Sequence, residues 1–233
     1  MPTSSTRLSR LIAELHPISL RIRPDAPGKD ARRRLPLGIP SLNAFLGGGL
    51  PCGAITEVVG GISSGRMTIA QVLTSAATHA GEFVAWVDLP NSLDPDGAQR
   101  AGVNLERVLW MYPVDLVAAF RAVEHVLGAG GFRLVLLDLD GPLQSRSLPA
   151  SAWLRIARVA VRSDAAIVVL SASRIAGAFA TLSLEICPLR RAFVGEGGPC
   201  PVFEGAVSSL YLRKYKFGAS GGVPVDIFAS TRA

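Results

Sequence analysis

Cysteine, lysine and aromatic residues are scarce in this chain of 233 residues, and the scarcity excludes several classes of protein. The three cysteines, Cys52, Cys187 and Cys200, are an odd number at wide spacing, which fits neither a zinc motif nor a redox motif. We expect them to be thiols in a reducing compartment. The three histidines also lie far apart in the sequence and lack metal-ligand spacing. The sequence therefore offers no metal centre built from cysteine or histidine.

Long apolar runs are missing as well. Hydrophobic residues make up 49% of the chain, yet no uninterrupted segment is long enough to span a bilayer, and the first residues lack the apolar core of a signal peptide. We therefore expect a cytoplasmic protein without a membrane partner. The length fits one α/β domain with extensions.

Positive charge is concentrated at the start of the chain. Residues 1–34 hold eight basic and three acidic residues, a net charge of +5 out of +6 for the whole chain. We predict that this arm is a separate unit, with a short amphipathic helix over residues 6–15 and an extended linker up to residue 34. The core domain would then occupy residues 35–233.

The arm is the candidate surface for a partner or for DNA, because an arginine cluster can follow phosphates or dock on an acidic protein. Lysine occurs only three times in the chain, so a general preference for arginine is an equally simple explanation of the cluster. The candidate residues are the apolar face of the helix and the last arginines of the linker: Leu8, Leu11, Ile12, Leu15, Arg32, Arg33 and Arg34.

Residues 55–69 predict a strand, a loop bounded by glycines, and a helix. The strand covers residues 55–59 and the helix runs from residue 66 to about residue 80. This order is typical of a P-loop, Gly-x-x-x-x-Gly-Lys-Ser/Thr, in which backbone N–H groups and a helix N-terminus surround phosphates. The glycines have the right spacing, but Arg66 replaces the lysine and Met67 replaces the hydroxyl residue that would hold Mg²⁺. The candidate residues of this vestigial nucleotide site are Gly60, Ser63, Ser64, Gly65, Arg66, Met67, Thr68 and, farther along the chain, Asp94.

Strands and helices alternate through the rest of the chain, which indicates an α/β fold with a mostly parallel sheet. Predicted strands cover residues 83–88, 132–138, 165–170 and 182–189, a helix covers residues 151–163, and a hairpin made of residues 207–217 and 223–228 ends the chain. Asp138 ends one of these strands and is the candidate metal ligand, with Asp140 close by.

Several short segments, taken in order, resemble the ATPase core of RecA-type recombinases. They are residues 37–43, the turn at residues 47–51, the P-loop, and the Leu-Asp-Pro sequence at residues 93–95. The resemblance covers about residues 35–174. It implies a RecA-like P-loop core with a mostly parallel central sheet, helices on both sides and a C-terminal antiparallel hairpin.

The departures from the RecA pattern predict that hydrolysis is lost. By this resemblance, Pro90 stands where the family places the glutamate that orients the attacking water, and proline has neither an acid nor a base. Gly97 stands where a ring would stack on adenine, and Ser173 stands where an amide would sense the γ-phosphate, whereas Asp94 matches the residue that contacts the adenine amine. We assign no catalytic residue and expect no resident cofactor beyond weak binding of ATP and Mg²⁺, because the Arg66 guanidinium can still bind phosphate.

A RecA-like core that has lost these residues and keeps an N-terminal helix resembles the ImuA family, the accessory proteins of the SOS mutagenesis cassette. This resemblance implies a role in translesion synthesis beside ImuB, an inactive Y-family polymerase-like protein, and through it an error-prone DNA polymerase. Contact with RecA and with DNA belongs to the same hypothesis. Two alternatives stay open: an active DNA-stimulated RecA-like ATPase, and a SulA-type inhibitor of cell division.

Overall fold

The structure is a computed structural model that describes residues 33–140, 149–194, 202–216 and 225–230. The predicted amphipathic helix, with Leu8, Leu11, Ile12 and Leu15, lies outside these residues, as does Arg32. The roles assigned to them stay predictions.

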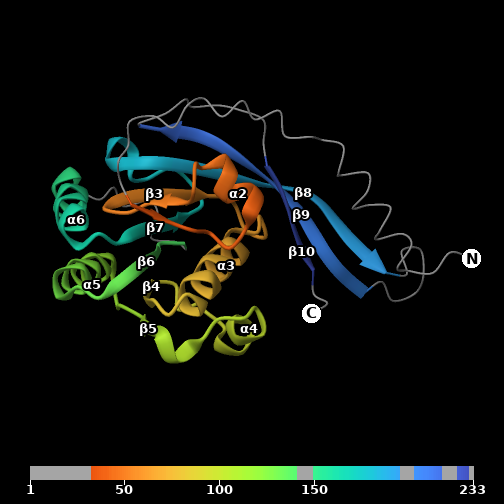
Figure 1. Ribbon diagram of the computed structural model, residues 1–233, viewed down its shortest axis with the longest axis horizontal. Helices are drawn as coiled ribbons and strands as arrows, with labels where there is room; N and C mark the ends of the chain where they lie inside the picture. The colour runs from red at the N-terminus through yellow and green to blue at the C-terminus, as the bar shows by residue number, and fades with distance from the viewer. Residues whose placement is uncertain (1–32, 141–148, 195–201, 217–224, 231–233) are drawn as a thin grey trace, which may run out of the picture.

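An eight-stranded sheet forms the centre of the molecule, in the order β10-β9-β8-β3-β7-β6-β4-β5 (Figure 1). The six strands from β8 to β5 pair in parallel, and β8, β9 and β10 pair antiparallel. The strands are β3 (Ala54–Val59), β4 (Phe83–Asp88), β5 (Val108–Met111), β6 (Phe132–Asp138), β7 (Ala166–Ser171), β8 (Ala180–Val194), β9 (Val202–Tyr215) and β10 (Val225–Ser230).

Helices cover both faces of this sheet and bury two separate cores. The helices are α2 (Pro40–Phe45), α3 (Arg66–His79), α4 (Pro95–Arg100), α5 (Leu116–Ala129) and α6 (Ala150–Ser163). One core includes buried residues of α2, α3 and α4, and the other includes buried residues of α5 and α6. A small sheet of β1 (Arg34–Leu35) and β2 (Leu50–Pro51) precedes β3, and two 3₁₀ turns, η1 (Leu105–Arg107) and η3 (Gly177–Phe179), complete the described elements.

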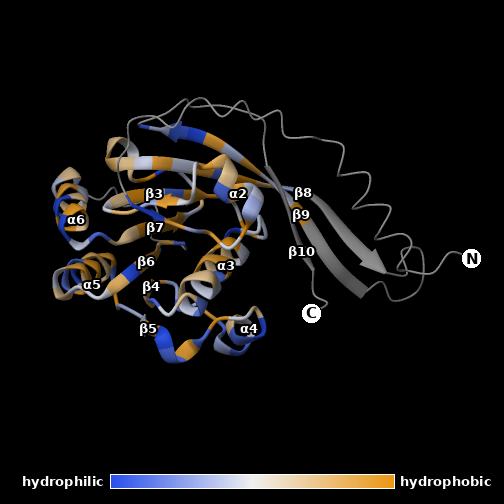
Figure 2. Cartoon of the chain, viewed as in Figure 1, coloured by the Kyte–Doolittle hydropathy of each residue, from blue (hydrophilic) through white to orange (hydrophobic). Residues whose placement is uncertain are grey.

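Strand β7 shows why the sequence takes this layered form. Every residue of β7 is buried, and neighbouring residues belong to opposite cores: Val168 packs with α3, whereas Ile167 and Val169 pack with α5 and α6. A parallel strand covered on both faces needs such a continuous β-branched run. On the α5–α6 side, Phe120 and Trp153 meet edge to face with ring centroids 4.9 Å apart. Figure 2 shows hydrophobic residues along the central strands, between the covering helices.

The fold class predicted from the sequence is confirmed, including the antiparallel strands at the C-terminal end. The strands predicted at residues 83–88 and 132–138 have the bounds of β4 and β6. The strand predicted at residues 182–189 is too short, because β8 continues to Val194 in its pairing with β9 across register shifts. No helix of the described segments is long and apolar enough to cross a membrane.

Candidate functional site

The P-loop joins β3 to α3 at the carboxyl edge of the parallel strands. Its two glycines are required by local geometry. A Cβ on Gly60 would lie 2.4 Å from Ser64 Oγ and 2.5 Å from Ile186 Cγ2, and Gly65 has a left-handed φ of 97°. Two hydrogen bonds also join the loop to neighbouring strands. Gly60 N–H donates to the Ser171 carbonyl of β7 at 3.1 Å, and Ser208 Oγ of β9 donates to the Ser64 carbonyl at 2.7 Å. The backbone cradle that the sequence predicts is therefore present.

Arg66 occupies this cradle from within. Its side chain is only 10% exposed at the first position of α3. Nη1 donates to the Gly60 carbonyl, and Nη2 donates to the Asp140 carboxylate just beyond the end of β6. The guanidinium thus closes the loop on itself and joins it to the neighbouring strand end. Its terminal nitrogens Nη1 and Nη2 thus each donate to an oxygen atom of the protein itself.

The residues on either side of Arg66 offer little to a metal ion. Met67 packs, partly buried, against the core on the α3 side of the sheet. Ser64 is 1% exposed, and its Oγ has no hydrogen-bond partner among the described residues. Ser63 is exposed, in a left-handed conformation with φ 59°, and Thr68 is half-buried in the first turn of α3. At position 67 the thioether side chain supplies no hard oxygen ligand of the kind Mg²⁺ prefers.

Two buried aspartates end adjacent strands beside the loop. Asp88 and Asp138 are register partners on β4 and β6. Asp138 is 1% exposed, and burial raises its pKa to about 6, against the opposing effects of the Asp140 N–H, which it accepts at 3.0 Å, and of the Arg66 charge. Within the described ranges no group of three His, Cys, Asp or Glu residues is arranged to hold a metal ion. The metal role of Asp138 stays a prediction.

Asp88 serves the turn after β4. Its carboxylate accepts the N–H groups of Ser92 and Leu93 at 3.1 and 2.9 Å and the indole N–H of Trp110 at 3.2 Å. Pro90 lies in this turn, half-buried. The first two bonds hold the backbone turn that carries Pro90, and the third joins Asp88 to β5.

Asp94 caps α4. Its Oδ1 accepts the Asp96 N–H at 3.1 Å, and its Oδ2 lies 3.6 Å from an Arg100 nitrogen. A Cβ on Gly97 would lie 2.6 Å from Asp94 Oδ2, so a larger residue there would displace this carboxylate. Ser173 is exposed in the loop after β7, and its carbonyl accepts the Ser171 hydroxyl at 2.8 Å.

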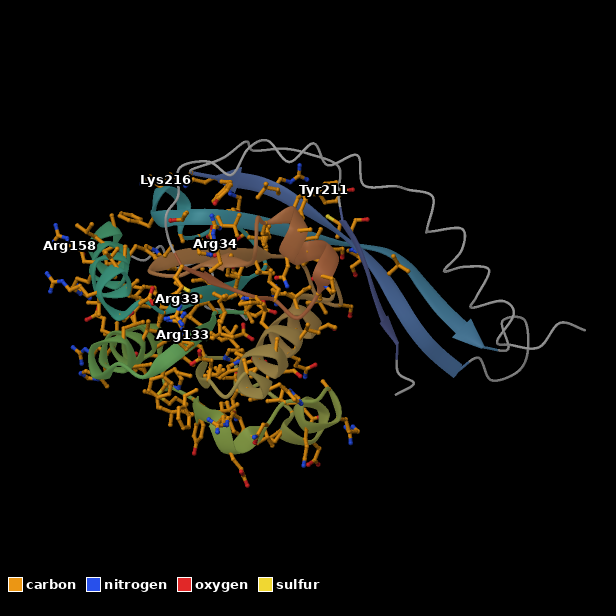
Figure 3. The ribbon with its side chains drawn as sticks, viewed as in Figure 1. Arg33, Arg34, Arg133, Arg158, Tyr211 and Lys216 are labelled. Carbon is orange, nitrogen blue, oxygen red and sulfur yellow. The ribbon has the colours of Figure 1, made fainter. Side chains whose placement is uncertain are left out.

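Of the arginines in the predicted arm, Arg33 and Arg34 are described, and both contact the core (Figure 3). Arg34 in β1 donates to the Gly49 carbonyl at 3.4 Å and to the Tyr215 hydroxyl, with its guanidinium 5.6 Å from the Tyr215 ring centroid. Arg33 lies 3.5 Å from an Asp164 oxygen. The structure places these two residues on the core surface, whereas their binding role stays a prediction.

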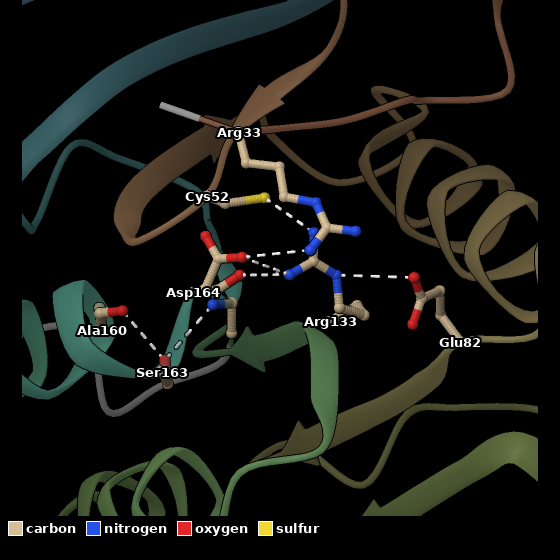
Figure 4. Close-up of polar contacts among 8 residues, drawn as sticks. Arg33, Cys52, Glu82, Arg133, Ala160, Ser163 and Asp164 are labelled. Carbon is tan, nitrogen blue, oxygen red and sulfur yellow. Dashed lines mark hydrogen bonds and ion pairs between the residues drawn. The ribbon is translucent and has the colours of Figure 1, made fainter. Parts of the chain in front are cut away.

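Sequence reasoning missed a second arginine cluster, at the amino edge of the sheet (Figure 4). Arg133 donates to the Asp164 carbonyl and carboxylate at 2.8 Å each, lies 3.6 Å from a Glu82 oxygen, and donates to Cys52 Sγ at 3.6 Å. Burial raises the pKa of the Cys52 thiol, which keeps it protonated. A lone arginine in the apolar strand sequence FRLVLLD was the available signal.

Glu57 is another buried acidic residue that sequence reasoning did not select. It lies in the middle of β3 at 0% exposure, and its Oε1 accepts the N–H groups of Ile175 and Ala176 at 2.8 and 2.5 Å. Lys214 in β9 donates to the Gly177 carbonyl at 2.9 Å. The Glu57 bonds therefore fasten the loop after β7 to the P-loop strand, and the Lys214 bond fastens it to β9.

Comparison with known proteins agrees with this geometry. Residues 31–148, just over half of the chain, match the RecA N-terminal domain family. The chain belongs to the RecA N-terminal domain family. Protein RecA of Streptomyces ambofaciens is 34% identical over 114 residues, which cover 48% of this chain and 31% of the relative. A plasmid-encoded Protein RecA of Lactococcus lactis subsp. lactis is 34% identical over 105 residues, or 45% of this chain and 31% of the relative.

This member of the RecA N-terminal domain family thus aligns with less than a third of the length of these curated relatives. Among solved structures, it resembles the RadB recombinase with a TM-score of 0.63 and 20% identity, over 84% of this chain and 95% of the other. At this identity the likeness shows the fold alone. The narrower resemblance to ImuA stays a prediction.

Proposed function

We propose that this RecA-family chain is an ImuA-type adaptor in damage-induced translesion synthesis, which uses its P-loop core as a scaffold and does not turn over ATP. The observation that carries the proposal is the engagement of Arg66 by the Gly60 carbonyl and Asp140. In a working P-loop the cation at this position reaches the phosphates. Here, a phosphate would have to displace a carboxylate that is already paired with Arg66 in a nearly buried site.

Two further features of the site support the loss of turnover. Met67 packs against the core and offers no oxygen to a metal ion, and Pro90 offers neither an acid nor a base beside the turn that Asp88 holds. The residues present therefore do not fit an ATP–Mg²⁺ complex poised for hydrolysis. What they do fit is a rigid P-loop that preserves the shape of the family core.

Phosphate release tests this part of the proposal. Purified chain with ATP and Mg²⁺, with and without single-stranded DNA, should release phosphate no faster than a matched Arg66→Ala variant. ATP binding is titrated in parallel by fluorescence. Robust Mg²⁺-dependent release that Arg66→Ala or Asp138→Asn abolishes would overturn it and favour a DNA-stimulated ATPase.

The partners in this proposal are a polymerase-like protein of the ImuB type, an error-prone polymerase reached through it, RecA and DNA. The basic arm supports a docking role, since it carries a net charge of +5 and an apolar set of Leu8, Leu11, Ile12 and Leu15 at helical spacing. In RecA-type proteins an N-terminal helix packs on the neighbouring subunit, and by analogy this arm would dock on RecA or on a polymerase-like partner.

Deletion of residues 1–32 tests the arm while leaving β1 and the contacts of Arg33 and Arg34 in place. The truncated chain should lose capture of RecA and of the polymerase-like partner in pull-down assays and keep the thermal unfolding midpoint of the full chain. A Leu8→Ser, Leu11→Ser double variant separates the apolar face from the charge. Unchanged capture by both variants would remove the arm from the proposal.

A further inference from the structure

The outer face of α6 carries two parallel ridges of different chemistry. Arg155, Arg158 and Arg162 recur at i, i+3 and i+7 and form one ridge of the helix. Leu154 and Val161, 40% and 65% exposed, are seven residues apart and form the adjoining ridge. The helix contains no acidic residue.

This face is additional to the contacts that hold α6 in the fold. Trp153, Ile156 and Ala160 on the inner face are buried and account for the packing of the helix on the sheet. Figure 3 shows Arg158 pointing away from the body of the molecule. Arg155 is paired with Glu124 of α5 at 2.8 Å, but no carboxylate of the described residues lies within ion-pair distance of Arg158 or Arg162.

The neighbouring helix extends the same charge. Together α5 and α6 hold four arginines and one glutamate, a net charge of +3, and that glutamate is already paired with Arg155. Arg121 and Val117 on α5 are also exposed, and Val117 is 58% exposed. The two-helix layer therefore presents positive charge beside exposed apolar side chains.

We infer that this face, defined by Leu154, Arg158, Val161 and Arg162, binds an acidic amphipathic helix of a partner protein. Charge complementarity requires an acidic ridge opposite Arg158 and Arg162, and Leu154 and Val161 require an apolar ridge beside it. A nucleic acid backbone would use the arginines but would leave two aliphatic side chains without a function. The inference goes beyond the proposed adaptor role of the P-loop core and does not depend on whether nucleotide binds.

Fluorescence anisotropy with the full chain at low salt tests the inference. The probe is a labelled helical peptide of about 18 residues, or five turns, with leucines on one ridge and glutamates on the next. Its controls are a peptide of scrambled order and a labelled DNA oligonucleotide in single-stranded and duplex form. We expect the patterned peptide to bind more tightly than the scrambled one.

Matched variants locate the contact. Arg158→Glu and a Leu154→Ser, Val161→Ser double variant should each weaken peptide binding by about five- to tenfold, because the first reverses the charge in the middle of the basic ridge and the second removes the apolar ridge. Arg100→Glu is the control, since Arg100 is a 75% exposed arginine on α4, and α4 packs on the opposite face of the sheet from α6. Its effect should stay within about twofold.

Three results would overturn the inference. The first is a patterned peptide that binds no better than the scrambled one, and the second is binding that responds to Arg158→Glu and Arg100→Glu alike. The third is DNA binding that Arg158→Glu weakens while the Leu154→Ser, Val161→Ser variant changes nothing, which would assign the face to nucleic acid. Because the assay needs no ATP and variants in α6 locate the contact, failure here is distinct from failure of the adaptor proposal.

Discussion

Two arginine-centred clusters lie at opposite edges of the same sheet. At the carboxyl edge Arg66 joins the Gly60 carbonyl to Asp140, and at the amino edge Arg133 joins Asp164 to Glu82 (Figure 4). Both arginine side chains are nearly buried, at 10% and 14% exposed. The acids around Arg133 precede strands β7 and β4, so they tie the strand starts together.

The comparison of the two clusters suggests a role for Arg66 in the P-loop. A buried guanidinium needs acceptors for its donors and a compensating negative charge, and both clusters supply them from within the chain. At the amino edge this arrangement joins the starts of β4, β6 and β7. At the carboxyl edge the same arrangement occupies the position where the family holds phosphate, which is why we interpret Arg66 as a clamp rather than as a ligand.

The largest expected effect is at the amino edge. Arg133→Ala should lower the free energy of unfolding by about 2–4 kcal/mol, because it leaves Glu82 without its cation, Asp164 with only the exposed Arg33 as a cation, and the Asp164 carbonyl without its donor. Urea titration followed by circular dichroism measures the change. Arg155→Ala removes a surface pair with Glu124 and should cost no more than about 1 kcal/mol. Equal losses for the two variants would contradict a structural role specific to Arg133.

A somewhat smaller effect is expected from Arg66→Ala. It removes the donor to the Gly60 carbonyl and the partner of Asp140, but Asp140 is 28% exposed and can recruit water, so we expect a loss of about 1–3 kcal/mol. The same urea titration applies. A variant as stable as the parent would mean that Arg66 is not a clamp, and the parallel with Arg133 would fail.

Asp138→Asn should change how the stability of the protein depends on pH. Burial raises the pKa of Asp138 from 3.8 to about 6, so the folded state holds this proton more tightly than the unfolded chain. Its stabilising contribution is complete below about pH 4 and is lost as the pH rises through about 6. The Asp138→Asn variant has no proton to lose at this position, so between pH 4 and pH 7 its stability relative to the parent should rise by about 1–3 kcal/mol. Thermal unfolding midpoints across this range measure the shift, and a difference independent of pH would contradict it.

The smallest effect is expected from Arg66→Lys, which restores the P-loop cation of the family. Stability should fall by about 1 kcal/mol, since an ammonium cannot reproduce both guanidinium contacts. Phosphate release should stay at the level of the parent, because Met67 and Pro90 are unchanged. Turnover gained from this substitution alone would break the interpretation that the whole site has decayed.

The sequence was sufficient for the elements around the P-loop. Largely apolar strands, such as β6, and a helix that follows a glycine, such as α3, are signalled locally, and their predicted bounds agree with the structure. The replacement of the P-loop cation by Arg66 is visible in the same way. The ion pair that Arg66 makes with Asp140 is not visible in the sequence, because Asp140 lies 74 residues away. Only the parallel pairing of β3, β7 and β6 brings the two side chains together.

The length of β8 was also underestimated from the sequence. Residues 190 and 191 are both arginines, which suggested the end of a strand, yet β8 continues because its backbone pairs with β9. Pairing with a strand that is distant in sequence can override a local polar signal. The Arg133 cluster was missed for a related reason, since its members come from four separate segments of the chain.

Local periodicity and glycine spacing alone place the strands, the helices and the phosphate-type loop in order, because hydrophobic repeats and backbone conformation act over a few neighbouring residues. They also reveal which P-loop residues have been exchanged. Only the tertiary structure decides that Arg66 is held by Gly60 and Asp140 and that α6 turns a basic and apolar face outward. Both depend on which strands and helices become neighbours, and that is settled by burial of the two cores rather than by any single stretch of sequence.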